Sequence, residues 1–115
     1  MPFAKLKPRE AHKSNGLLLL ATGGDYITYD ISDKDWVNVQ LVSADGTAFG
    51  AATVTVDAAT DGASFANFPA GAETITAFGL NDLIIVTGLS TLRVYVSAAA
   101  GTARALVLVT AGVTI

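Results

Sequence analysis

The chain has 115 residues, of which 51% are hydrophobic and only 15% are charged, and it has a formal net charge of −3 and no cysteine. This composition excludes disulfide bonds and thiolate chemistry, and no apolar run approaches the roughly 20 residues that a membrane-spanning helix needs. A chain of 115 residues is expected to form a single domain. Ordinary soluble domains are about 25% charged, so the lower charged fraction here predicts that part of the surface is buried against other proteins.

The charges are divided unevenly along the chain. Residues 1–15 contain four Lys or Arg and one Glu, a balance of +3, whereas residues 16–115 contain three basic and nine acidic groups, a balance of −6. Two prolines and the lack of a periodic apolar pattern predict an extended basic arm at 1–15 and a globular domain at 16–115. An acidic protein surface suits this arm better than nucleic acid, which the acidic body would repel. The side chains predicted to tether the arm are Lys5, Lys7, Arg9 and Lys13.

From Gly16 onward, short strand-like runs alternate with turn signals. Within the run 36–43, Val37, Val39 and Leu41 alternate with other residues and are predicted to point inward. The runs lie at 17–22, 26–31, 36–43, 51–57, 74–77, 83–88, 92–97 and 102–108, with a further short strand expected near Phe65 in the loop 59–71. Their spacing of about ten residues, without a helical stripe, predicts an all-β antiparallel sandwich or jelly roll.

The last two runs, in "LRVYVSAAAGTARALVLVT" (92–110), are predicted to form a hairpin. Ala98 to Gly101 would form a four-residue loop, with Gly101 free to adopt a positive φ, and pairing Ser97 with Thr102 would set the register. In that register Tyr95 lies directly opposite Arg104, a suitable cation–π pair. The face that points away from the core is then predicted to carry Arg93, Tyr95, Arg104, Leu106 and Leu108.

Two leucines on an outward face need an explanation, because such a face normally alternates to polar residues. Either the chain covers them itself, for example with "LLLLA" (17–21), or another subunit does. In the second case the tyrosine and arginines of that face would anchor the interface.

Residues for catalysis are scarce. The only histidine, His12, lies in the predicted arm, which offers no rigid surroundings for a general base. We therefore expect no enzymatic activity and no cofactor. The best metal candidate is the acidic cluster Asp30, Asp33 and Asp35, but its spacing is not that of an EF-hand loop, and a solvated turn explains it better.

Aromatic side chains leave a carbohydrate site as an alternative. Sugar binding requires exposed rings, and the phase of Trp36 relative to Val37 places it on the outer face of its strand. The other candidate rings are Tyr26, Tyr29 and Tyr95.

The segments "WVNVQLVSADGTAFGAATVTVDAATDGASFANFP" and "GLSTLRVYVSAAAGTARALVLV" together resemble small β-sandwich virion proteins of tailed bacteriophages, of the head-decoration (cement) or fibre type. The shared pattern is a strand pair, an Asp-Gly turn followed by an aromatic residue and Pro (Asp61-Gly62, Phe65, Pro69), and a closing hairpin in which the strand with Arg93 meets the turn Gly101-Thr102-Ala103. It covers about residues 36–110.

This resemblance implies a phage capsid decoration protein on the virion surface. Such a protein binds the major capsid protein across subunits, reinforces the shell and forms a homo-oligomer, a dimer or trimer. The alternative is a carbohydrate-binding sandwich of a phage tail or fibre. Neither function involves a membrane.

Overall fold

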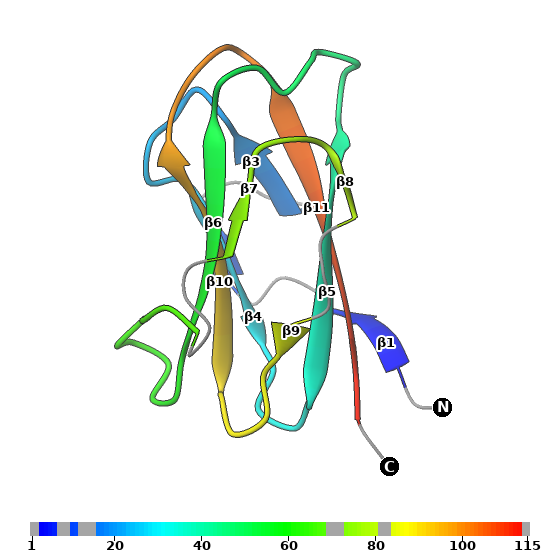
Figure 1. Ribbon diagram of the computed structural model, residues 1–115, viewed down its shortest axis with the longest axis vertical. Coiled ribbons are helices and arrows are strands. Elements are labelled where there is room, and N and C mark those ends of the chain that lie inside the picture. The colour runs from blue at the N-terminus through cyan, green and yellow to red at the C-terminus, as the bar shows by residue number, and fades with distance from the viewer. Residues whose placement is uncertain (1–2, 7–9, 12–15, 69–72, 81–83, 114–115) are drawn as a thin grey trace.

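The computed structural model describes residues 3–6, 10–11, 16–68, 73–80 and 84–113, and within them the chain forms β-strands and turns without an α-helix. The strands make two antiparallel sheets that pack face to face, seen side by side in Figure 1. The predicted all-β sandwich is therefore confirmed. Within the described residues, no helix has the length and apolar character needed to cross a bilayer.

The first sheet, called here the β11 sheet, has β11 and β5 at its centre. Its order is β1-β11-β5-β8, and β9 also pairs with β5. β1 pairs with β11 at residues 109–112, and β3 pairs with β11 at residues 104–106. Its strands are β1 (Phe3–Leu6), β3 (Leu17–Leu19), β5 (Trp36–Ser43), β8 (Gly79–Leu80), β9 (Ile84–Ile85) and β11 (Arg104–Gly112).

The second sheet, called here the β10 sheet, has the order β2-β4-β10-β6-β7. Its strands are β2 (Glu10–Ala11), β4 (Tyr26–Asp30), β6 (Thr53–Ala59), β7 (Glu73–Ile75) and β10 (Thr91–Ala98). The described parts of the predicted arm thus pair with both sheets, β1 with β11 and β2 with β4.

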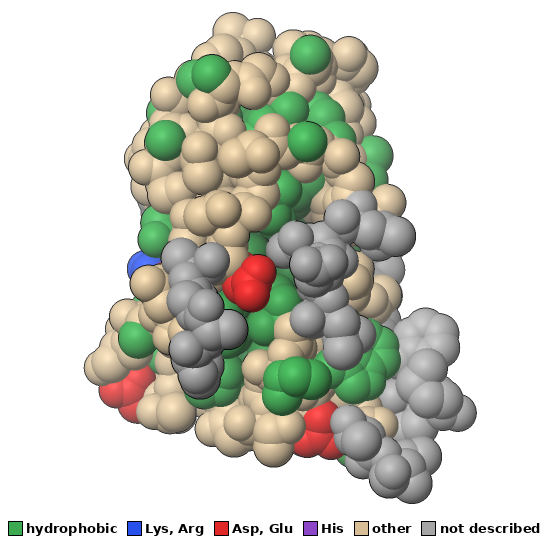
Figure 2. Space-filling view, viewed as in Figure 1, with side chains coloured by type: hydrophobic (Ala, Val, Ile, Leu, Met, Phe, Trp, Pro, Cys, Tyr) green, Lys and Arg blue, Asp and Glu red, His purple; other side chains and the backbone are tan. Residues whose placement is uncertain are grey.

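The core lies between the sheets and is built from alternate residues of each strand. The inward side chains of the four longest strands are Val37, Val39 and Leu41 in β5, Val54 and Val56 in β6, Leu92, Val94 and Val96 in β10, and Ala105, Val107 and Val109 in β11. The inward phase predicted for 36–43 is confirmed. On the side of the molecule shown in Figure 2, hydrophobic side chains are visible in the middle, and few charged side chains are visible.

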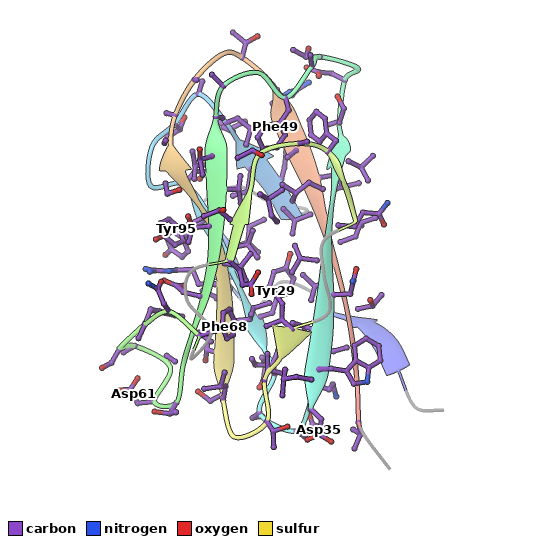
Figure 3. All side chains as sticks on the ribbon, in the orientation of Figure 1. Tyr29, Asp35, Phe49, Asp61, Phe68 and Tyr95 are labelled. Atoms are coloured by element: carbon purple, nitrogen blue, oxygen red, sulfur yellow. The ribbon has the colours of Figure 1, made fainter. Side chains whose placement is uncertain are left out.

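Tyr29 is the largest fully buried side chain and lies between the sheets (Figure 3). Its hydroxyl has no hydrogen-bond partner among the described residues. Burial in this apolar layer raises the pKa of Tyr29 far above its usual value, because the phenolate would lose its hydration.

The predicted hairpin is wrong, because β10 and β11 belong to different sheets. β10 pairs with β4 on one side and β6 on the other, so both of its edges are occupied. The segment after Ala98 instead crosses between the sheets, where the N–H of Ala100 donates to the carbonyl of Leu20 and the N–H of Leu20 donates to the carbonyl of Ala103, both at 3.0 Å. Gly101 does adopt the expected positive φ, at 67°.

Other strand boundaries differ modestly from prediction. The run 36–43 is β5 in full, whereas 17–22 shortens to β3 and 51–57 shifts to β6 at Thr53–Ala59. The strand expected near Phe65 is only an isolated bridge between Ala58 and Ala66.

Candidate functional site

The outer face of the β11 sheet carries a group of aliphatic side chains. Leu106 pairs in register with Leu17 of β3 on one side and Val42 of β5 on the other, and Leu108 lies two residues further along β11. We call Leu17, Leu19, Val42, Leu106 and Leu108 the apolar outer face, and all five side chains are partly exposed. β3 therefore extends this face sideways and does not lie over it, so the expectation that "LLLLA" (17–21) covers the two leucines is wrong.

One end of the apolar outer face carries an exposed ion pair. Arg104, opposite Leu19 in register, places its Nε 3.5 Å from a carboxylate oxygen of Asp45. The pKa of Asp45 lies below its usual value, chiefly because the backbone N–H of Thr47 donates to the carboxylate, with Arg104 adding a smaller effect.

At the other end of this sheet, Trp36 of β5 packs onto Gly112 of β11, its partner in register. A Cβ atom at Gly112 would overlap the indole, lying 2.5 Å from Cε2 and 2.7 Å from Nε1 of Trp36. Trp36 is on the outer face, as its phase predicted, and it is partly buried.

The outer face of the β10 sheet has a different chemistry, centred on a salt bridge. Arg93 donates from Nε to Oδ1 of Asp57 at 2.9 Å and from Nη2 to Oδ2 at 2.5 Å. The Asp57 side chain is 5% exposed and that of Arg93 30%, so the pair is largely removed from water. The carboxylate stabilises the charged guanidinium, which raises the pKa of Arg93.

Two aromatic rings complete the environment of the guanidinium. The Arg93 Cζ atom lies 4.4 Å from the ring centroid of Phe65 and 4.4 Å from that of Tyr95, which are cation–π distances. Tyr95 follows Arg93 by two residues on the same face, and Figure 3 shows it outside the sheet. The guanidinium is thereby fixed by its hydrogen bonds to Asp57 and by its contacts with the two aromatic rings.

Phe65 reaches Arg93 because the loop after β6 is organised by Asp61. Its carboxylate accepts hydrogen bonds from the N–H groups of Ala63 and Ser64 and from the Ser64 hydroxyl, at 2.7–2.9 Å. These bonds favour the ionised carboxylate and lower the pKa of Asp61 to about 2, with the Ser64 hydroxyl as the largest cause. Gly62 accommodates the turn with a φ of 81°.

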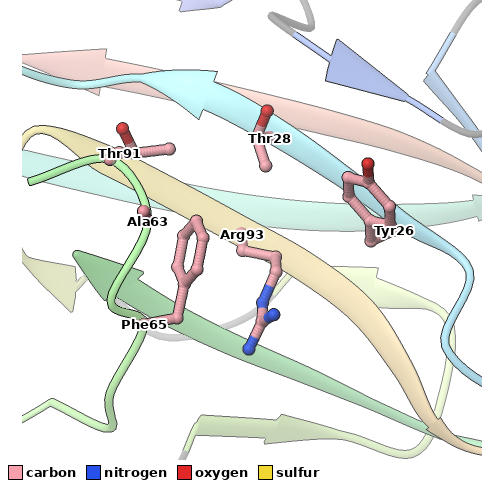
Figure 4. A pocket seen from close by; sticks show the side chains of 7 residues that line it. Tyr26, Thr28, Ala63, Phe65, Thr91 and Arg93 are labelled. Atoms are coloured by element: carbon pink, nitrogen blue, oxygen red, sulfur yellow. The ribbon is translucent and has the colours of Figure 1, made fainter.

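Between this loop and the strands β4 and β10 lies a pocket of about 420 Å³, shown in Figure 4. It is lined by Tyr26, Thr28, Gly62, Ala63, Phe65, Thr91 and Arg93. It therefore combines two aromatic rings, three hydroxyl groups and one guanidinium.

The structure does not gather the predicted interface residues on one surface. Arg93 and Tyr95 lie on the outer face of the β10 sheet, whereas Arg104, Leu106 and Leu108 lie on the outer face of the β11 sheet. The predicted contact between Tyr95 and Arg104 is therefore wrong, and Tyr95 contacts Arg93 instead. Of the predicted tether residues, Lys5 lies in β1, and Lys7, Arg9 and Lys13 lie outside the described residues, as does His12.

The three carboxylates of the metal candidate have separate partners. Asp30 accepts from the N–H and hydroxyl of Ser32, Asp33 pairs with Lys34 at 2.9 Å, and the Asp35 carboxylate accepts from the Thr87 hydroxyl at 3.1 Å. Within the described residues, no group of three or more His, Cys, Asp or Glu side chains is placed to hold a metal ion.

Of the candidate sugar-binding rings, Tyr29 is excluded because it is 1% exposed in the core. Tyr26 lines the pocket beside Arg93, and Tyr95 packs against the same guanidinium. Sequence reasoning did not anticipate the pairing of Arg93 with Asp57.

No protein-family model, curated protein or solved structure matches this chain.

Proposed function

We propose that this chain is a structural virion protein, a capsid decoration (cement) protein of a tailed bacteriophage. It binds the major capsid protein on the outside of the shell, forms a homo-oligomer and reinforces contacts between capsid subunits. The apolar outer face is the observation that carries this proposal, since Leu17, Leu106 and Val42 form a continuous row of partly exposed aliphatic side chains.

The whole outer face of the β11 sheet, of which the apolar outer face is a part, is large enough for this role. The molecule measures 40 × 29 × 25 Å, so one face of the sandwich covers on the order of 1,000 Å², comparable to the roughly 800 Å² that each partner buries in a standard interface. A shell presents many equivalent sites, and an oligomer engages several at once, so each contact needs only modest affinity. The low charged fraction of the chain agrees with burial against another protein.

The test is co-sedimentation of the full-length protein with intact and expanded capsids of the phage that encodes it, comparing Leu108→Asp with Thr74→Asp. Leu108 lies in the apolar outer face, whereas Thr74 is exposed on β7, opposite Thr55, in the other sheet. Loss of an interface anchor costs about 2 kcal/mol or more, so Leu108→Asp is expected to bind at least roughly 30-fold more weakly. The Thr74→Asp protein is expected to bind normally.

Circular dichroism separates loss of binding from loss of fold. Because Leu108 is partly exposed, its substitution by Asp leaves the carboxylate in contact with water and the sandwich folded. The proposal fails if the wild-type protein does not sediment with capsids, or if folded Leu108→Asp protein sediments as well as the wild type.

The tether proposal needs a charge-reversal variant. Deleting residues 1–15 would also remove β1 and β2 from the two sheets, and a loss of binding would then be ambiguous. Replacing the four basic residues Lys5, Lys7, Arg9 and Lys13 by Glu preserves the chain length and changes the arm's balance from +3 to −5. Weaker, less salt-dependent binding supports the tether, and unchanged binding contradicts it.

A further inference from the structure

We propose that the pocket beside Arg93 binds one ring of a neutral saccharide. This site lies on the outer face of the β10 sheet, away from the apolar outer face, and the inference does not depend on the capsid proposal. It also differs from a site at Trp36, which lies on the other sheet.

The pocket lining offers the two kinds of contact that a sugar ring uses. Phe65 and Tyr26 present aromatic surface to the C–H groups of a pyranose, and Tyr26 also offers a hydroxyl group to its hydroxyls (Figure 4). Thr28 and Thr91 also line the pocket but are only 6% and 2% exposed. A hydroxyl both donates and accepts, so it can pair with a sugar hydroxyl in either direction. The volume of about 420 Å³ is near the lower end of the range for small-molecule sites, which limits the ligand to about one ring.

Arg93 supplies a fixed donor. Within the described part of the chain, its side-chain hydrogen bonds run from Nε and Nη2 to Asp57, which leaves the Nη1 group available to a ligand. The carboxylate and the contacts with Phe65 and Tyr95 fix the guanidinium before a ligand arrives, so binding does not have to order this long side chain.

The charges around the pocket favour a neutral ligand. Asp57 neutralises Arg93, and two further carboxylates lie nearby, Asp30 beside Thr91 in register and Asp61 in the loop that carries Phe65. These carboxylates repel phosphate and carboxylate ligands, while the guanidinium in the wall repels an ammonium group. A polyhydroxylated ring without charge meets neither penalty.

The first experiment is an NMR titration of ¹⁵N-labelled full-length protein with D-glucose, D-galactose, D-mannose and N-acetyl-D-glucosamine. We expect at least one sugar to shift the Nε–H signal of Arg93 and the amide signals of Ala63 and Phe65, with a dissociation constant in the millimolar range. The Nε–H signal of Arg104, on the opposite sheet, is the internal control and should not move. D-glucuronate and D-glucosamine are expected to bind at least tenfold more weakly than the corresponding neutral sugar.

The second experiment blocks the pocket. Ala63 is an exposed lining residue, so Ala63→Trp should fill the pocket and weaken sugar binding at least tenfold without lowering the melting temperature. Ala66→Trp is the matched control, because Ala66 is exposed in the same loop but outside the lining. The proposal is overturned if no neutral sugar shifts Arg93, if inorganic phosphate or a charged sugar binds more tightly, or if binding survives Ala63→Trp.

Discussion

Replacing Arg93 with Met is expected to lower the free energy of unfolding by about 3 kcal/mol. Removing one partner of a buried ion pair costs roughly 3–5 kcal/mol, because the remaining charge stays buried without compensation. The Asp57 side chain is 5% exposed and meets this condition, whereas the 30% exposure of Arg93 places the estimate at the lower end. Since small domains are stable by only about 5–15 kcal/mol, the loss should be obvious.

The assay is urea unfolding followed by circular dichroism and extrapolated linearly to water. Arg104→Met is the matched control: its 48% exposed side chain makes a 3.5 Å contact with Asp45, so its loss should cost less than about 1 kcal/mol. Adding Asp57→Asn to Arg93→Met removes the stranded charge and should restore at least about 1 kcal/mol. Equal losses for Arg93→Met and Arg104→Met would refute the reasoning.

Three further predictions concern residues elsewhere in the fold. Tyr29→Phe removes a buried hydroxyl that has no partner among the described residues. Chemical denaturation should therefore show a free energy of unfolding that is unchanged or higher by up to about 1 kcal/mol, and a clear decrease would reveal a hydrogen bond to this hydroxyl. Gly112→Ala introduces a methyl group that overlaps the Trp36 indole, so it should lower the free energy of unfolding by about 1–3 kcal/mol and alter tryptophan fluorescence. The control Gly23→Ala should do neither, because its Cβ would lie 3.8 Å from the Cβ of Ala99. Asp61 has a folded pKa of about 2, below its ordinary 3.8, so its contribution to stability is present above pH 4 and is lost as the pH falls toward 2. An NMR titration of the Asp61 carboxyl should show that Ser64→Ala raises this pKa, and an unchanged pKa would contradict the assigned cause.

The sequence predicted the fold class because the strand pattern is local. In 36–43, Val37, Val39 and Leu41 alternate with partly exposed positions, and this alone defines a strand with one buried face. The hairpin failed because alternation does not identify a strand's partner. Leu92 to Val96 and Ala103 to Val107 would point into a core equally well from one sheet or from two facing sheets, and residues more than 30 positions away decide between these arrangements.

The pocket beside Arg93 was beyond local reasoning for the same reason. Asp57 and Arg93 meet only through the register of β6 against β10, which depends on the whole second sheet. A weak signal existed, since both residues occupy outward positions in alternating strands and carry opposite charges. The position of Phe65 additionally required the turn at Asp61.

The topology determines the order in which the sheets can be completed during synthesis on the ribosome. β10 lies between β4 and β6, so without it the β10 sheet is two separate ladders, β2 with β4 and β6 with β7. β11 likewise joins β1 and β3 to β5. Both central strands lie within residues 91–112, so neither sheet can close until this segment has left the ribosome. Until then the nascent chain has unpaired strand edges and exposed valines and leucines, the features that favour aggregation during synthesis.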